Sequence, residues 1–160
     1  MILSGVWRKV KMNRIPLNRR LIGSKWVFKV KRDCQFRSHL CALGYSQVPG
    51  VDFTDNFAPV VKNVTLRLLF ILWMMEGYEG SISDVETAFL YGNLDEEIYM
   101  RIPQGYSEVT CTKTSEDDCL ALNKSIYGLV QVARQWWKRF VTALKTLGFV
   151  SCKNDDCLME

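Results

Sequence analysis

Histidine is almost absent from this 160-residue chain: His39 is the only one, and none of the six cysteines belongs to a Cys-x-x-Cys pair. A structural zinc site needs four Cys or His ligands in closely spaced pairs, so the composition argues against that class of site. Disulfides form in oxidising compartments, and no secretory signal accompanies these cysteines. We therefore expect free thiols, buried or on the surface. The cysteines are Cys34, Cys41, Cys111, Cys119, Cys152 and Cys157.

Long hydrophobic runs are missing as well. The longest, Leu68–Met75, has eight residues, whereas a helix needs about 20 to cross a bilayer. The opening residues, MILSGVWRKVK, contain no apolar core before a small-residue cleavage site. The sequence therefore predicts an intracellular protein without membrane contact, and both cytoplasm and nucleus stay open as its location.

Proline and glycine are scarce, with four and ten residues, while aromatic residues make up 12% of the chain. Collagen, low-complexity repeats and wholesale disorder are excluded, because those classes are rich in Gly or Pro or poor in aromatic rings. A chain of this length buries a core large enough to fold without cross-links. We find no internal repeat and no linker, so one domain is expected.

Acidic residues are nearly missing from the first 40 positions, where eleven Lys and Arg face one acid, Asp33. That segment carries a net charge of +10 and residues 41–160 carry −6, which together give the +4 of the chain. Such a split is typical of a basic surface for a polyanion beside an acidic working region. A basic arm that only keeps the chain in solution explains the same charges, and both readings stay open from charge alone.

Apolar and basic residues alternate along KWVFKVKRD (25–33), and this period of two predicts a strand. A second strand is expected at 36–45 after a turn at 33–35, which makes a basic hairpin. The preceding segment, Ser4–Leu21, is expected to be an irregular arm, because Pro16 and its polar neighbours interrupt any periodicity. A turn through Pro49-Gly50 is predicted after the hairpin.

Two helices are predicted. The first begins at Asn63 or Thr65, either of which can cap a helix N-terminus, and ends at about Glu76 before Gly77. Because LRLLFILWMM is apolar on almost every side, this helix is expected to be buried between layers. The second covers 131–147, where apolar side chains recur at helical spacing.

Shorter strands are expected at 80–85, 97–103 and 119–123, and a last one begins within 149–159. A turn at Gly92-Asn93 and a polar loop at 105–118 separate them. Strands and helices are mixed without regular βαβ alternation, so the predicted fold class is α+β.

The most distinctive segment is SDVETAFLYGNLDEEIYM (83–100). Asp84 closes the expected strand at 80–85, and a carboxylate at a strand end is held and exposed, as a metal ligand must be. An Asp here is also a common helix cap, and both readings stay open from position alone. Phe89 could equally be core, and Asp95–Glu97 are expected in a solvated turn.

Four long segments occur in a fixed order: KWVFKVKRD, ALGYSQVPGVDFTDNFAPVV, SDVETAFLYGNLDEEIYMRIPQGY and LNKSIYGLVQVARQWW. In this order and spacing they closely resemble the reverse transcriptase domain of copia-type LTR retrotransposon polyproteins, from about Val6 to the last residue. The resemblance implies an RNA-directed DNA polymerase with a partial right-hand fold. Residues 1–24 would be a basic arm, 25–80 mainly fingers, and 81–160 part of the palm.

The resemblance also implies roles for single residues. Asp84 matches the first catalytic aspartate, and Val85 would add its backbone carbonyl as a second ligand for Mg²⁺. Phe89 falls where the family places an aromatic ring beneath the sugar, so that a 2′-hydroxyl would collide with it. Hairpin cations would meet the triphosphate, and a later segment would pack near the templating base. The cations are Lys29, Lys31, Arg32 and Arg37, and that segment contributes Tyr127, Gly128 and Gln131.

The implied partners are an RNA template, a DNA primer, deoxynucleoside triphosphates and the remainder of the retroelement polyprotein. Two positions depart from the family pattern: His39 stands where arginine is usual, and Val130 where lysine is usual. A neutral imidazole attracts phosphate less than a guanidinium does. We therefore expect weaker contact with the triphosphate at His39.

The second carboxylate pair of the family, in a Tyr-x-Asp-Asp hairpin, is expected shortly after CLM (157–159), beyond Glu160. Asp155-Asp156 is not that motif, because it precedes the expected strand. Two-metal catalysis needs several anionic oxygens, and Asp84 alone does not provide them. The chain is thus expected to be inactive by itself, and two alternatives stay open: a non-catalytic nucleic-acid-binding module that uses the basic hairpin, and a decayed retroelement product.

Overall fold

A four-stranded mixed sheet forms the core of the fold in the computed structural model, which describes residues 5–160. β1 and β5 each pair antiparallel with β6, and β2 pairs parallel with β5. The predicted α+β class is confirmed. The strands, in spatial order, are β1 (Trp7–Lys11), β6 (Asp118–Lys124), β5 (Asn93–Arg101) and β2 (Leu21–Ile22).

Both faces of this sheet are covered, because side chains along a strand alternate between its two faces. Ile98 and Met100 of β5 point into the larger core cluster, together with Leu120 and Leu122 of β6. Tyr99, between them, lies in a smaller cluster on the opposite face. The strands predicted at 97–103 and 119–123 are therefore confirmed as the buried centre of the fold.

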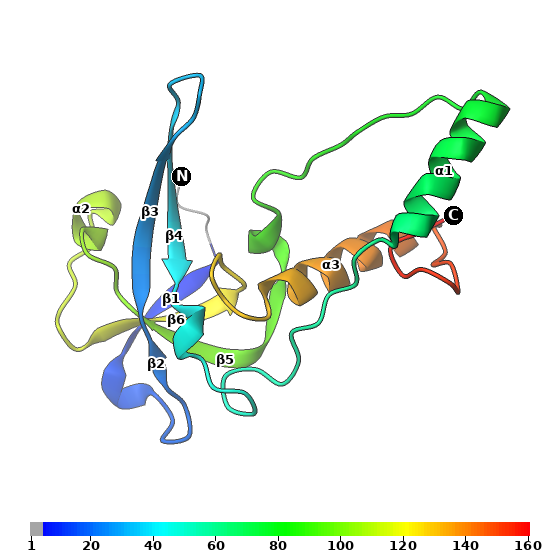
Figure 1. Cartoon of the computed structure of the whole chain (residues 1–160). Coiled ribbons are helices and arrows are strands. Elements are labelled where there is room, and N and C mark those ends of the chain that lie inside the picture. Colours follow the sequence, from blue (N-terminus) through cyan, green and yellow to red (C-terminus); the bar gives the residue numbers. More distant parts are fainter. Residues whose placement is uncertain (1–4) are drawn as a thin grey trace.

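The predicted basic hairpin is present as β3 (Ser24–Val30) paired with β4 (Phe36–Ala42), and it projects from the sheet (Figure 1). Residues directly opposite each other in an antiparallel pair share a face. Lys29 therefore lies on the same face as its partner Arg37, whereas Trp26 and its partner Leu40 lie on the other. The hairpin thus has one basic face and one largely apolar face.

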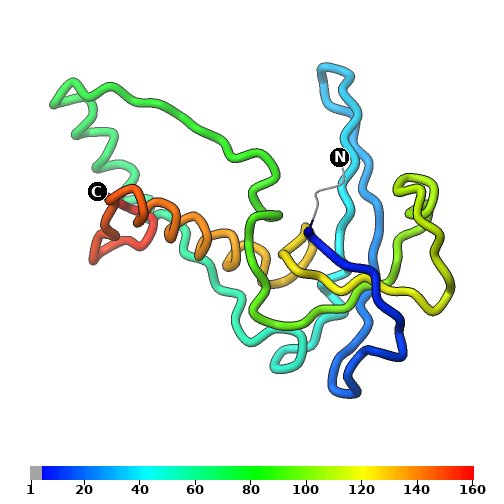
Figure 2. Tube along the Cα trace, turned by 180° about the vertical axis from the view of Figure 1, so that it is seen from behind, coloured from blue at the N-terminus to red at the C-terminus, as the bar shows by residue number. Residues whose placement is uncertain are grey.

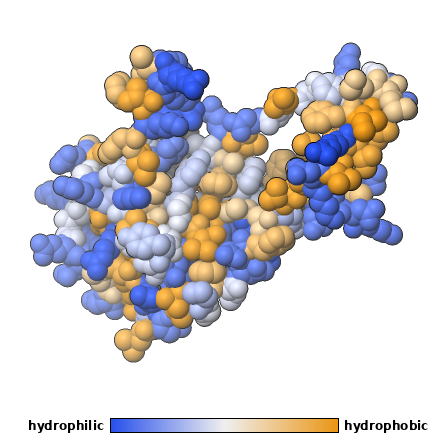
Figure 3. All heavy atoms as spheres, viewed as in Figure 1, coloured by the Kyte–Doolittle hydropathy of each residue, from blue (hydrophilic) through white to orange (hydrophobic). Residues whose placement is uncertain are grey.

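The two predicted helices are also present, as α1 (Asn63–Glu76) and α3 (Val132–Thr146). Gly77 ends α1 in the left-handed conformation, as the sequence predicted. The prediction that α1 is buried between layers is wrong: none of its residues is buried, and Figure 3 shows its apolar side chains on the surface. Within residues 5–160 no other element surrounds α1, so its apolar side chains are not covered by the rest of the protein.

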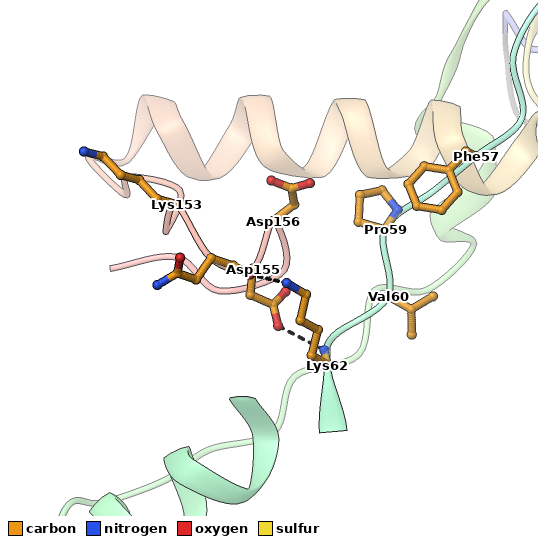
Figure 4. A pocket seen from close by; sticks show the side chains of 8 residues that line it. Phe57, Pro59, Val60, Lys62, Lys153, Asp155 and Asp156 are labelled. Atoms are coloured by element: carbon orange, nitrogen blue, oxygen red, sulfur yellow. Dashed lines mark hydrogen bonds between the residues drawn. The ribbon is translucent and has the colours of Figure 1, made fainter. Parts of the chain in front are cut away.

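The start of α1 also differs from the prediction, since Lys62 occupies the cap position and no side chain of the helix caps it. Asp155 does so from the C-terminal segment: its Oδ2 accepts a hydrogen bond from the backbone N–H of Lys62 at 2.9 Å (Figure 4). The strand expected within 149–159 is reduced to one antiparallel bridge between Ser151 and Met159. The turn that this bridge closes holds Asp155 against α1.

Two further predictions fail because tertiary pairing decides strand formation. The segment Ser4–Leu21, expected to be irregular, contributes β1 and the start of β2 within its described part, since both find partners in the central sheet. Residues 80–85, expected to be a strand, have no regular structure. An extended segment needs a neighbouring strand for its backbone hydrogen bonds, and none of the described strands pairs with this one. Figure 2 shows it running free between α1 and the sheet.

The turn expected at Gly92-Asn93 and the solvated turn expected at Asp95–Glu97 are wrong as well, since β5 begins at Asn93. Asp95 accepts hydrogen bonds from Gln135 (3.0 Å) and Lys138 (2.6 Å), so it joins β5 to α3. The loop expected at 105–118 contains a short helix, α2 (Tyr106–Thr110). No helix in the described part of the chain is long and apolar enough to cross a membrane.

Candidate functional site

A hollow of about 550 Å³ lies between β4 and the segment that precedes β5. Besides Val85, four of the residues singled out from the sequence contribute to its lining: Arg37, Asp84, Phe89 and Tyr127. They come from three parts of the chain that are far apart in sequence. Val85 lies in the same lining, and so does His39, the residue that departs from the family pattern.

Asp84 is exposed and lies in the irregular segment before a short 3-10 helix, η3 (Ala88–Tyr91). The alternative reading, a helix cap, does not describe it, because Thr87 occupies the cap position of η3 and no side chain makes a capping hydrogen bond there. The Asp84 carboxylate therefore borders the hollow and does not cap a helix. Glu86 lies in the same lining, which places two acidic residues beside the hollow.

Two rings, those of Phe89 and His39, lie against the ring of Tyr127. Its ring centroid lies 5.1 Å from that of Phe89, with an interplanar angle of 64°, and 4.9 Å from that of His39. Edge-on and tilted contacts at this separation are favourable for aromatic pairs. Phe89, although it follows Asp84 by only five positions, thus packs against Tyr127, which lies 38 positions further along the chain.

The backbone next to Tyr127 is fixed against β4. The carbonyl oxygen of Tyr127 accepts a hydrogen bond from the Ala42 N–H at 2.8 Å. Gly128 has a φ of 89°, and a Cβ added there would collide with the carbonyl oxygen of Ala42. Only glycine permits both this conformation and this close approach. Gly128 therefore places Tyr127 beside the hairpin.

Gln131 does not line the hollow. Its side chain is fully buried, accepts a hydrogen bond from Gln47 Nε2 (3.1 Å) and donates one to the carbonyl of Asp52 (3.2 Å). Gln47 in turn accepts a hydrogen bond from the Val130 N–H. This buried network joins the start of α3 to the loop after the hairpin.

The four candidate cations extend from the hollow to the tip of the hairpin. Arg37 lines the hollow and lies opposite Lys29 in the strand register. Lys31 closes the tip, where its backbone N–H donates to the carbonyl of Gln35 at 2.9 Å. Arg32 is exposed in the tip turn. Like charges directly opposite one another destabilise a bare hairpin, so the Lys29–Arg37 pair favours an anion nearby.

The residues of the hollow do not amount to a complete metal site. Within residues 5–160 there is no cluster of three or more His, Cys, Asp or Glu side chains placed to hold a metal ion. A pair of divalent cations needs more anionic oxygens than Asp84 and a backbone carbonyl supply. The described donors therefore fit only part of the expected Mg²⁺ site.

Thr87 is a residue of the site that the sequence did not reveal. It lines the hollow between Asp84 and Phe89 and has a φ of 54°. A β-branched residue in the left-handed region is a true conformational outlier, and such strain tends to gather at functional segments. No local sequence pattern marks Thr87, because threonine does not favour this backbone conformation by itself.

Comparison with known proteins identifies the family of the chain. Residues 5–159 match the family model described as reverse transcriptase (RNA-dependent DNA polymerase). The chain is 37% identical over 153 residues to the retrovirus-related Pol polyprotein from transposon TNT 1-94 of Nicotiana tabacum, which covers 92% of this chain and 11% of that protein. It is 34% identical over 143 residues to the Pol polyprotein from transposon RE2 of Arabidopsis thaliana, with 86% and 10% covered.

A more distant relative is the truncated transposon Ty1-A Gag-Pol polyprotein of Saccharomyces cerevisiae, 27% identical over 143 residues, with 89% of this chain and 11% of that protein covered. The chain thus spans about a tenth of the length of these curated relatives. No solved structure matches it. Because the family model covers nearly the whole chain, the protein belongs to the reverse transcriptase family, in the group of copia-type retrotransposon Pol polyproteins.

Proposed function

We propose that this chain supplies the nucleotide-binding part of an RNA-directed DNA polymerase active site. The observation that carries the proposal is the meeting of Arg37, Asp84, Phe89 and Tyr127 around one hollow. A polymerase site has to bring together a cation that binds the triphosphate, a carboxylate that binds metal at the reacting end of the primer, and an aromatic ring that contacts the sugar. In this scheme the β3–β4 hairpin belongs to the fingers and the central sheet to the palm.

Each residue has a physical role in the proposal. Arg37, with Lys29, Lys31 and Arg32 along the hairpin, stabilises the negative charge that develops on the pyrophosphate leaving group. Asp84 and the carbonyl of Val85 provide hard oxygen ligands. Phe89, held by Tyr127 at 5.1 Å, presents a rigid ring beneath the sugar, where a 2′-hydroxyl would clash. Gly128 and Gln131 have positioning roles: Gly128 allows Tyr127 to lie beside the hairpin, and Gln131 holds the start of α3 in place.

The proposed cofactor is Mg²⁺, which the family uses and which supplies charge neutralisation when bound. Asp84 and Val85 would hold it together with carboxylates contributed by another part of a longer polyprotein. The proposed partners are an RNA template, a DNA primer, deoxynucleoside triphosphates and the other parts of that polyprotein. Without the additional carboxylates, we expect the 160-residue chain alone not to extend a primer with Mg²⁺ or Mn²⁺.

The test is a hybrid enzyme. Residues 5–160 replace the corresponding segment of a copia-type relative with measurable polymerase activity, and primer extension is followed on an RNA template. The hybrid should be active, and Asp84→Asn should abolish its activity, because a neutral amide is a poor Mg²⁺ ligand. Asp156→Asn, an exposed acid outside the hollow, is the control and should leave activity unchanged. An active Asp84→Asn hybrid would overturn the proposal.

The basic face of the hairpin favours a second candidate function, a non-catalytic nucleic-acid-binding module. Lys29 and Arg37 share this face, and both are exposed. Under this candidate the chain would bind polynucleotides through the hairpin, and Asp84→Asn would have no effect on any measured property. The hybrid enzyme separates the two candidates, because only the first predicts activity that depends on Asp84.

A further inference from the structure

Ser125 is fully buried directly after β6, two positions before Tyr127, and the proposed chemistry does not use it. Its hydroxyl donates a hydrogen bond to the backbone carbonyl of Phe89 at 2.5 Å. The same hydroxyl lies 3.3 Å from the carbonyl oxygen of Gly92, and the backbone N–H of Ser125 donates to that oxygen at 2.8 Å. Ser125 therefore contacts both the start and the end of η3, the short helix that carries Phe89.

Gly92 allows this contact because it has no side chain. A Cβ built on Gly92 would lie 2.5 Å from the hydroxyl oxygen of Ser125 and 2.9 Å from the Cβ of Gln135, closer than side-chain atoms approach in folded proteins. Gln135 belongs to α3 and is itself buried. The end of η3 therefore packs directly on Ser125 and on α3.

The short helix η3 has little means of holding its own position. A 3-10 helix of this length has few hydrogen bonds of its own, and their geometry is poor. The segment that leads into it, residues 80–85, has no regular structure (Figure 2). Thr87 at its start has a φ of 54°, a conformation that persists only where the surrounding structure maintains it. Contacts from outside η3 must therefore set the position of Phe89.

Two such contacts reach Phe89 from a single segment, residues 125–128. Ser125 binds its backbone carbonyl, and the ring of Tyr127 packs against its ring with 5.1 Å between the centroids. The segment is held in turn by Ile126, which is buried in the larger core cluster. Because the ring of Phe89 moves with its backbone, the hydrogen bond from Ser125 controls how far the ring reaches into the hollow.

We propose that Ser125 is a positioning residue for sugar discrimination, and that its buried hydroxyl keeps the ring of Phe89 where a 2′-hydroxyl would clash. The inference rests on the proposed polymerase function, in which Phe89 lies beneath the sugar. A buried hydroxyl is costly unless it is hydrogen-bonded, and the partners of this one are the carbonyls of η3 and Gly92. With alanine in its place, residue 125 would hold η3 only through its backbone N–H.

The first test uses the hybrid enzyme. Ser125→Ala should raise the ratio of ribonucleotide to deoxyribonucleotide kcat/KM by about two- to tenfold, the change that corresponds to one neutral hydrogen bond. Asp155→Asn is the matched control, because it weakens a hydrogen bond from a buried side chain to the backbone outside the hollow. This control should leave the ratio unchanged even where stability falls. A parental ratio in Ser125→Ala would overturn the proposal.

A double variant shows whether Ser125 acts through Phe89. In a Phe89→Ala hybrid there is no ring left to position, so adding Ser125→Ala should change the ratio by less than about twofold, which is within the usual error of additivity. An undiminished effect of Ser125→Ala in that background would assign the hydroxyl to another role and overturn the proposal.

Nuclear magnetic resonance on the purified chain follows the ring directly. Ring protons of Phe89 and Tyr127 should show a nuclear Overhauser effect, which Ser125→Ala should weaken and Asp155→Asn should preserve. An unchanged effect in Ser125→Ala would contradict the positioning role. An active, Asp84-dependent hybrid in which Ser125→Ala keeps the parental ratio would refute this inference alone, whereas activity that does not depend on Asp84 would refute the proposed function.

Discussion

Asp155 accepts a hydrogen bond from the backbone N–H of Lys62, 93 residues earlier in the chain, with 2.9 Å between Oδ2 and nitrogen. Its other carboxylate oxygen accepts one from the N–H of Cys157 at 3.0 Å. Asp155 is buried and lies where a helix cap would lie, yet it belongs to another segment (Figure 4). The cap of α1 is thus provided by tertiary structure, and it ties the exposed helix to the C-terminal turn.

We predict that Asp155→Asn lowers the melting temperature by about 2–4 °C, the shift expected for one weakened helix cap in a chain of this size. Hydrogen bonds from Thr65 and from the backbone N–H groups of Lys62 and Cys157 lower the pKa of Asp155. Its contribution is therefore present above the ordinary pKa of about 3.9 and is lost as pH falls through the lower folded value. Asp156→Asn is the matched control, and an equal shift in both variants would contradict the capping role.

A second acid-sensitive link joins β1 to β6. Lys11 Nζ lies 2.8 Å from Asp118 Oδ1, and the Ser115 N–H donates to Oδ2 at 2.9 Å. These contacts lower the pKa of Asp118 to about 2. We predict that Asp118→Asn lowers the melting temperature at pH 6, and that the difference from the parent shrinks below about pH 4 and vanishes below about pH 2. Thermal unfolding across this pH range, with exposed Asp117→Asn as control, checks it; a pH-independent difference would exclude the ionised contact.

The basic hairpin predicts salt-dependent binding to single-stranded nucleic acid. Each neutralised phosphate contributes about −0.7 to the slope of log K against log salt, so four engaged cations give a slope of about −3. Replacing the four hairpin cations with Ala should remove most of the binding and flatten the slope. An equal number of exposed cations elsewhere serves as the control set, and a loss of the same size there would show that only net charge matters. The hairpin set is Lys29, Lys31, Arg32 and Arg37, and the control set is Lys113, Arg139, Lys145 and Lys153.

Substitution of Phe89 tests the role of its ring, which lies beside Tyr127. In the hybrid enzyme, Phe89→Ala should raise the ratio of ribonucleotide to deoxyribonucleotide kcat/KM by about 10- to 200-fold, the range for one misfitting group in a pocket. The physical reason is that, in the proposed role, the ring would clash with the 2′-hydroxyl in the transition state. Phe149→Ala, at an exposed ring outside the hollow, should leave the ratio unchanged. A destabilised Phe89→Ala hybrid with the parental ratio would assign Phe89 to packing alone.

Local patterns in the sequence were sufficient to predict a strand or a helix wherever apolar side chains recur at a regular spacing within one segment. The alternation along 25–33 determined β3, and helical spacing determined α3, because each pattern reports which side chains share a face. Long motifs in a fixed order identified the family and pointed to Asp84, Phe89 and Tyr127. That these residues border one hollow follows from no local pattern, since the contact between Phe89 and Tyr127 joins distant parts of the chain.

Tertiary structure decided the features that depend on contact with a second segment of the chain. Residues 80–85 have the composition of a strand but no neighbour among the described strands, whereas the arm before the hairpin forms β1 and β2 because β6 and β5 accept them. The apolar run of α1 predicted burial, yet the helix lies exposed and takes its cap from Asp155. The physical reason is that hydrophobicity and period are local properties, whereas burial, strand pairing and capping require a second segment whose place only the folded chain sets.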